Sequence, residues 1–227
     1  MWRYGLTLFL AALITGCGNS VNGDVIATRD GGSTVNGSVR VPAGLQVRAV
    51  NTVNGSIDVE DGATAGAARA VNGEIKIGAR ATVDSVVTVN GAITLGDSSH
   101  VKADATTVNG EIELRRDSEV AGSVQTVDGS IDLTDAHVRG GLRTVAGSIE
   151  IMGSSHVDGG ILVEKNNGAI FGSTSSSKPR IVIGPGAVVQ GTLKFEREVQ
   201  LYVSYKATIG PVEGATAVAF SGDKAPG

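Results

Sequence analysis

The three histidines of the chain follow the interval of a sequence repeat, and an acidic residue shares their pattern. His100, His137 and His156 each directly precede a valine, and Glu119 takes the equivalent place between the first two. Imidazole nitrogens and carboxylate oxygens are ligands that zinc takes in proteins. If these side chains stand in one column, about 4.8 Å apart as neighbouring strands are, they predict a transition-metal site.

The alternative interpretation is an exposed column that tolerates polar side chains. Thr64 and Thr82 hold the equivalent positions in the preceding units. Side chains on one flat face point in nearly parallel directions, which makes tetrahedral closure around zinc difficult. Both interpretations stay open, and we expect no obligatory cofactor.

A second column is largely acidic, and each member directly follows an isoleucine: Asp58, Lys76, Thr94, Glu113, Asp132 and Glu150. Three like charges in adjacent units repel unless a cation bridges them or salt screens them. Calcium is the cation that such oxygens favour, but it takes about 6–8 oxygen ligands. A solvated face with nearby arginines is the alternative.

The sequence gives little support to catalysis. Polysaccharide-cleaving β-helices need clustered carboxylates under long loops, and a short repeat leaves no room for such loops. The one sizeable excursion, 165–180, contains no carboxylate and no histidine, and Cys17 is the only cysteine. We therefore expect a non-catalytic protein.

The elements that must position these columns are units of 18 to 19 residues built on Thr-Val-Asn-Gly-x-Ile. A fixed short period is typical of a solenoid in which each unit is one coil. Asn and Gly tolerate the left-handed backbone of a sharp corner, and stacked amides can hydrogen-bond to one another. We favour such a structural ladder over a ligand-binding row. Its members are Asn36, Asn54, Asn72, Asn90, Asn109 and Asp128.

A six-residue spacing of aliphatic residues runs inside each unit. Three such spacings per coil predict three short faces, and therefore an all-β, triangular parallel β-helix. The predicted inward positions include Val35, Val53, Val71, Val89, Val108, Val127 and Val145, with a second inward column at Ile57, Ile75, Ile93, Ile112, Ile131 and Ile149. A column of threonines beside the first set needs no explanation beyond β-propensity.

The first residues have the pattern of a processing signal. Arg3 precedes a mostly apolar stretch, and Ile14-Thr15-Gly16-Cys17 resembles a bacterial lipobox, in which the cysteine is acylated. An ordinary secretory signal with an incidental cysteine is the alternative. We expect residues 1–16 to be a signal peptide and 17–32 a lipidated cysteine, linker and cap. The β-helix then spans 33–211, and 212–227 form a C-terminal cap and tail.

Composition and charge limit the classes of partner that this chain is expected to bind. The formal net charge is −4 and no basic block of the kind that nucleic-acid binding needs is present, so no nucleic-acid partner is expected. The 33 glycines and the few aromatic residues suit tight corners around a narrow aliphatic core. Acylated Cys17 would attach the chain to a membrane. Gly18 after the cysteine points to the outer membrane of the cell envelope, by the rule for bacterial lipoproteins.

The repeated Thr-Val-Asn-Gly-x-Ile units resemble the adhesin-like β-helix domains of bacterial envelope proteins over roughly 33–170. The later stretch 183–193 is similar to bactofilins, which are polymer-forming β-helices that lack a lipobox and usually act in the cytoplasm. The first resemblance implies binding of a cell-wall or surface polysaccharide or protein. The second implies self-association. Neither family supplies catalytic residues to this chain.

Overall fold

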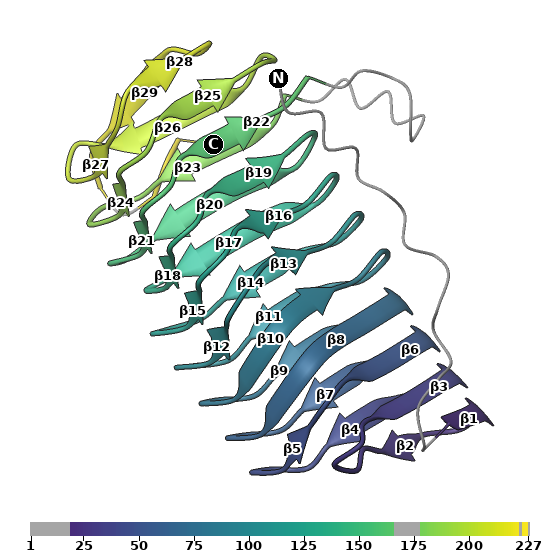
Figure 1. Cartoon of the computed structure of the whole chain (residues 1–227). Coiled ribbons are helices and arrows are strands. Elements are labelled where there is room, and N and C mark those ends of the chain that lie inside the picture. The colour runs from purple at the N-terminus through teal and green to yellow at the C-terminus, as the bar shows by residue number, and fades with distance from the viewer. Residues whose placement is uncertain (1–18, 166–177, 223, 227) are drawn as a thin grey trace.

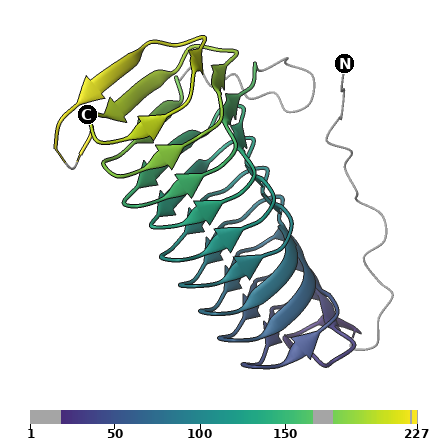
Figure 2. The ribbon, with the colours of Figure 1, turned by 60° about the vertical axis from the view of Figure 1, so that its left-hand side comes forward.

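The chain winds into a triangular parallel β-helix of about 10 turns in the computed structural model (Figure 1, Figure 2). The structure describes residues 19–165, 178–222 and 224–226. Cys17, the predicted signal peptide and most of the excursion 165–180 lie outside these residues. The part of the chain that is described contains no helix long and apolar enough to cross a membrane.

One side of the helix is an 11-stranded parallel sheet, which we call the isoleucine face. Its strands are β2 (Val25–Ile26), β4 (Val39–Val41), β7 (Ile57–Val59), β9 (Ile75–Ile77), β11 (Ile93–Leu95), β14 (Ile112–Leu114), β17 (Ser130–Thr134), β20 (Ser148–Met152), β23 (Arg180–Ile183), β26 (Gln200–Ser204) and β29 (Ala217–Phe220).

The other two sides share an 18-stranded sheet, because β8 (Thr64–Asn72) and β10 (Thr82–Val87) each extend across both of them. One side, the histidine face, adds β5 (Gln46–Val47), β12 (His100–Val101), β15 (Glu119–Val120), β18 (His137–Val138), β21 (His156–Val157), β24 (Val188–Val189) and β27 (Thr208–Ile209).

The third side, the threonine face, precedes the Asn-Gly corner of each coil. It adds β1 (Asn19–Asn22), β3 (Gly32–Asn36), β6 (Val50–Asn54), β13 (Ala105–Thr106), β16 (Val124–Gln125), β19 (Leu142–Thr144), β22 (Ile161–Val163), β25 (Leu193–Phe195) and β28 (Val212–Glu213). Each coil therefore visits the isoleucine, histidine and threonine faces in turn.

The coils stack in register, like residue on like residue. Ile57 pairs with Ile75, and Ile75 with Ile93, and all three side chains are fully buried. The isoleucine column predicted from the sequence is therefore confirmed. The core is a narrow aliphatic column along the axis, which fits the scarcity of aromatic residues.

The predicted inward positions are wrong on the threonine face except at Val108, which is buried. Val35, Val53, Val71, Val89, Val127 and Val145 are only half-buried there, whereas Val50, Val86, Val124 and Leu142 are buried three residues earlier in their coils. Successive strand residues point to opposite sides, so a register error of one residue exchanges the inward and outward sets. The threonines directly before these valines point inward instead.

The buried threonine hydroxyls are satisfied by the backbone of the preceding coil. Thr52 Oγ1 donates to the carbonyl of Gly37 at 2.9 Å, and Thr88 Oγ1 donates to that of Gly73 at 3.1 Å. The same bond recurs at Thr34, Thr107 and Thr126. A buried hydroxyl without such a partner would be costly, so these bonds let threonine occupy core positions beside each corner.

The Asn-Gly corners carry a continuous amide ladder. The Nδ2 of each asparagine donates to the Oδ1 of the asparagine one coil earlier, at 2.8–3.0 Å, along the series Asn22, Asn36, Asn54, Asn72, Asn90 and Asn109. Asp128 continues the column as the backbone partner of Asn109. These bonds explain the repeated asparagine without a ligand.

This core predicts a contrast between two aliphatic positions of one coil. Ile93→Ala should lower the free energy of unfolding by about 2–5 kcal/mol, because it leaves a cavity in a closed column. Val89→Ala should cost about 1 kcal/mol or less, because that side chain is half-exposed. Chemical denaturation followed by circular dichroism measures both. Equal losses would contradict the observed register of the threonine face.

Candidate functional site

The histidine face carries the predicted column of candidate ligands on its outer surface. Backbone pairing places His100 opposite Glu119, Glu119 opposite His137, and His137 opposite His156. The four side chains thus occupy equivalent positions in four successive coils. The strands that hold them, β12, β15, β18 and β21, lie one above another in Figure 1.

Serine hydroxyls brace the turns that precede β15 and β21. Ser118 Oγ donates to the Arg115 carbonyl, and Ser155 Oγ donates to the Met152 carbonyl, both at 2.6 Å. Between coils, Asp135 Oδ1 accepts hydrogen bonds from the Ser154 backbone N–H at 2.9 Å and from its hydroxyl at 3.0 Å. These bonds lower the pKa of the Asp135 carboxyl. They also fix the height of His156 above His137.

The first half of the column is an ion-pair group rather than a ligand cluster. Glu119 Oε2 lies 2.7 Å from His100 Nε2, and Glu119 Oε1 pairs with Arg139 Nε. The Glu119 side chain is 14% exposed, whereas those of His100 and Arg139 are 46% and 58% exposed. Both oxygens of the carboxylate are therefore engaged, and Glu119 does not approach the upper histidines as a third ligand.

The second half of the column converges on a carboxylate. The Nε2 atoms of His137 and His156 each lie 3.0 Å from Oδ1 of Asp158. Gln190 Nε2 lies 2.9 Å from the same His156 nitrogen. In the described ranges, His137, His156 and Asp158 form the one group of three metal-ligand side chains whose ligand atoms lie within 4.8 Å of one another.

Of the four predicted ligands, the structure brings His137 and His156 together with Asp158. His100 and Glu119 pair with each other. The sequence contained a usable signal, because Asp158 follows His156 by two residues, and residues two apart on an extended segment face the same side. Since Asp158 reaches the histidines from a neighbouring column, it removes the objection that all the ligands point in parallel directions.

The acidic column of the isoleucine face is aligned as predicted, but its carboxylates bond to separate neighbours. Glu113 pairs opposite Asp132, and Asp132 opposite Glu150. Glu113 accepts two hydrogen bonds from Arg115 at 3.0 and 3.1 Å, and Asp132 accepts one from Ser130 Oγ at 2.7 Å. Each of these two carboxylates is therefore bonded to its own neighbour, Glu113 to Arg115 and Asp132 to Ser130. The described residues of this column do not form the ring of oxygens that calcium needs.

A carboxyl group beside this column has a raised pKa. Burial raises the pKa of the Glu111 carboxyl, and the charge of Asp132 raises it further. An acid with a raised pKa in the folded state favours folding while it is protonated. That contribution is lost as the pH rises through the folded-state pKa.

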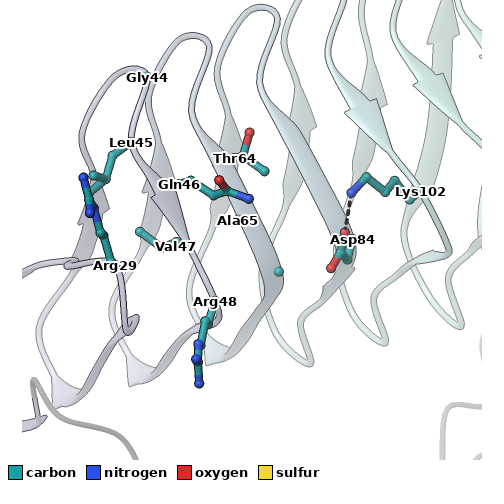
Figure 3. A pocket seen from close by; sticks show the side chains of 11 residues that line it. Arg29, Gly44, Leu45, Gln46, Val47, Arg48, Thr64, Ala65, Asp84 and Lys102 are labelled. Atoms are coloured by element: carbon teal, nitrogen blue, oxygen red, sulfur yellow. Dashed lines mark hydrogen bonds and ion pairs between the residues drawn. The ribbon is translucent and has the colours of Figure 1, made fainter.

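A shallow depression lies at the N-terminal end of the histidine face (Figure 3). Arg29 and Arg48 line it in the first coils, and Asp84 and Lys102 line it further along the stack. Lys102 Nζ contacts Asp84 Oδ1 at 2.9 Å. Three cationic side chains and one carboxylate thus surround the depression, so its lining is net positive on a chain that is net negative.

The depression exists because one coil carries small residues where its neighbours carry long ones. Pairing of Ala65 with Val83 and of Ala67 with Ser85 places Gly66 level with Asp84. A Cβ atom on Gly66 would lie 1.7 Å from the Arg48 carbonyl oxygen. The close approach of the two coils therefore requires glycine at this point.

Comparisons with protein-family models, with curated proteins and with solved structures find no match to this chain. The molecular class therefore rests on the fold alone, which is a parallel β-solenoid with repeated units. Any assignment of function has to come from the surface of the solenoid and from the sequence that precedes it.

The ion-pair group predicts a stability difference between two glutamates. Glu119→Gln should lower the free energy of unfolding by about 1 kcal/mol, because it removes a largely buried carboxylate that pairs with both Arg139 and His100. Glu113→Gln is the matched control. Its partner Arg115 is exposed, so the loss should stay below about 0.5 kcal/mol. Thermal and urea unfolding of both variants measure this, and indistinguishable midpoints would contradict it.

Proposed function

We propose that this chain is a non-catalytic, lipid-anchored protein of the bacterial cell envelope, with an adhesin-like β-helix that presents repetitive faces for binding. The lipobox ending at Cys17 supports the anchor and an extracytoplasmic position at the outer membrane. The resemblance of the Thr-Val-Asn-Gly-x-Ile units to envelope adhesin-like domains supports the binding role. The expected partners are the membrane and a cell-wall or surface polymer.

The observation that carries the binding role is the net positive depression of the histidine face. Arg29, Arg48 and Lys102 supply charge and hydrogen-bond donors, and Gln46 and Thr64 add neutral polar groups beside them. Arginine binds carboxylate and phosphate groups through two parallel hydrogen bonds. A shallow, open hollow on a flat face suits an extended anionic polysaccharide better than an enclosed small molecule.

The same depression supports binding rather than cleavage. Hydrolysis of a glycosidic bond uses a pair of carboxyl groups on either side of the bond. Asp84 is the one carboxylate in the lining, and Lys102 is bonded to it. A single carboxylate does not provide the pair that hydrolysis uses.

A second candidate is end-to-end self-association, as the similarity of 183–193 to bactofilins implies. One observation favours it. The terminal strands β2 and β29 of the isoleucine face carry Ile26 and Val218, which are 70% and 52% exposed. Exposed apolar residues on terminal strands, each paired on one side only within its sheet, are suited to pairing with another chain.

The anchor predicts a change of location. Cys17→Ser should move the protein from the membrane fraction to the soluble fraction, because the acyl chains that hold it would be missing. The circular dichroism of the variant should match that of the parent, because residue 17 precedes the first strand. Fractionation and immunoblotting measure the location. Retention of the variant in the membrane fraction would contradict the anchor. Sedimentation of the soluble variant as large polymers would favour end-to-end self-association.

The depression predicts charge-dependent binding to a cell-wall polymer. Arg48→Glu in the Cys17→Ser chain should weaken binding to purified cell-wall sacculi by at least about tenfold, because a donor is replaced by a repelling charge. Co-sedimentation with sacculi measures the bound fraction.

Arg116→Glu is the control, since it makes the same change of charge at an exposed residue that does not line the depression. It should leave binding within about twofold of the parent, a difference below roughly 0.5 kcal/mol. Equal losses in the two variants would show that net charge, and not the depression, governs binding.

A further inference from the structure

Three potential ligand atoms converge on the upper half of the histidine face. His137 Nε2 and His156 Nε2 lie at the same distance, 3.0 Å, from one oxygen of Asp158. The two rings are perpendicular, with centroids 5.3 Å apart. Two imidazoles from adjacent coils thus direct the same type of nitrogen at one carboxylate oxygen instead of lying parallel along the face.

A fourth polar group makes this arrangement difficult to satisfy by hydrogen bonds alone. His156 Nε2 lies near both Asp158 Oδ1, which accepts, and Gln190 Nε2, which donates at 2.9 Å. A ring nitrogen carries either a proton or a lone pair, so it cannot donate to one neighbour and accept from the other. Rotation of the Gln190 amide by about 180° exchanges its nitrogen for an oxygen and turns this group into a further possible ligand.

We propose that His137, His156 and Asp158 bind a divalent transition metal ion such as zinc, with Gln190 beside the open side of the site. Zinc takes imidazole nitrogen and carboxylate oxygen at about 2.0–2.2 Å. Tetrahedral ligands at those distances lie about 3.3–3.5 Å apart, close to the observed separations of 3.0 Å. Calcium and magnesium prefer sets made entirely of oxygen, so two imidazoles select against them.

The scaffold holds the ligands in place before any metal arrives. Backbone pairing of β18 with β21 sets the two histidines level, and the Asp135–Ser154 bonds lock the turns that precede them. The Asp158 N–H donates to the Val138 carbonyl at 3.0 Å. The side chains of the three ligands are 34–40% exposed, so an ion reaches them from solvent without a movement of the backbone.

Binding through Nε2 requires the neutral histidine tautomer that carries its proton on Nδ1. The ion therefore replaces the Nε2 hydrogen bonds to Asp158 with direct bonds. It ties the coil of β18 to the coil of β21 and leaves at least one coordination position facing outward. This site shares no residue with the basic depression and begins two coils beyond its last lining residue, Lys102, so it is independent of the polymer-binding role proposed above.

The test is metal binding by the full chain carrying Cys17→Ser, which removes the only thiol. Equilibrium dialysis against zinc chloride, with metal measured by mass spectrometry, should find one zinc ion per chain. Cobalt in place of zinc should give the intense visible absorption of a four-coordinate ion. His156→Ala and the isosteric Asp158→Asn should each weaken zinc binding by at least about 100-fold, since loss of an outer-shell partner alone costs about 10- to 100-fold.

His100→Ala is the matched control, because His100 stands in the same column and is bonded only within the ion-pair group. It should bind zinc as the parent does, within about twofold. Equal zinc binding by the parent and His156→Ala would overturn the proposal. So would a loss in His100→Ala as large as that in His156→Ala, because the metal would then use the column and not the convergent group.

Discussion

Stacking of each coil on the one before it, through hydrogen bonds between parallel strands, is the constraint on which the rest of this structure depends. It forces the side chain at any position to lie about one strand spacing from its equivalents above and below. Buried residues of the same type in successive coils then pack against one another, as Ile57, Ile75 and Ile93 do. The same constraint acts on the surface, so polar residues can interact along the axis only as columns.

The Asn-Gly corner shows how closely the coils approach. A Cβ atom on Gly55 would lie 1.9 Å from the carbonyl oxygen of Gly37, and one on Gly73 would lie 1.8 Å from that of Gly55. No other residue fits there, whatever its backbone preference. The Gly37 carbonyl also accepts the buried Thr52 hydroxyl, so the glycine, the threonine and the asparagine of the repeat are three parts of one corner.

The period of the repeat was enough to predict the fold, the isoleucine column and the pairing of His100, Glu119, His137 and His156. It was not enough to predict the register of the threonine face. Threonine and valine have nearly the same shape and β-propensity, and only the carbonyl that satisfies the hydroxyl decides which of them is buried. Asp158 was missed for a related reason. The two-residue spacing from His156 indicates the same side of the strand, but the approach of Asp158 to His137 depends on how the chain bends after β21.

The amide ladder also gives the molecule an electrical direction. Backbone hydrogen bonds between coils point both ways along the axis, since Gly37 donates forward to Asn54 while Thr64 donates backward to Leu45. The asparagine side chains all donate backward. Their dipoles therefore add along one edge, with the positive end toward β1. The corner therefore gives the coils from Asn22 to Asn109 a polarity that the aliphatic core lacks.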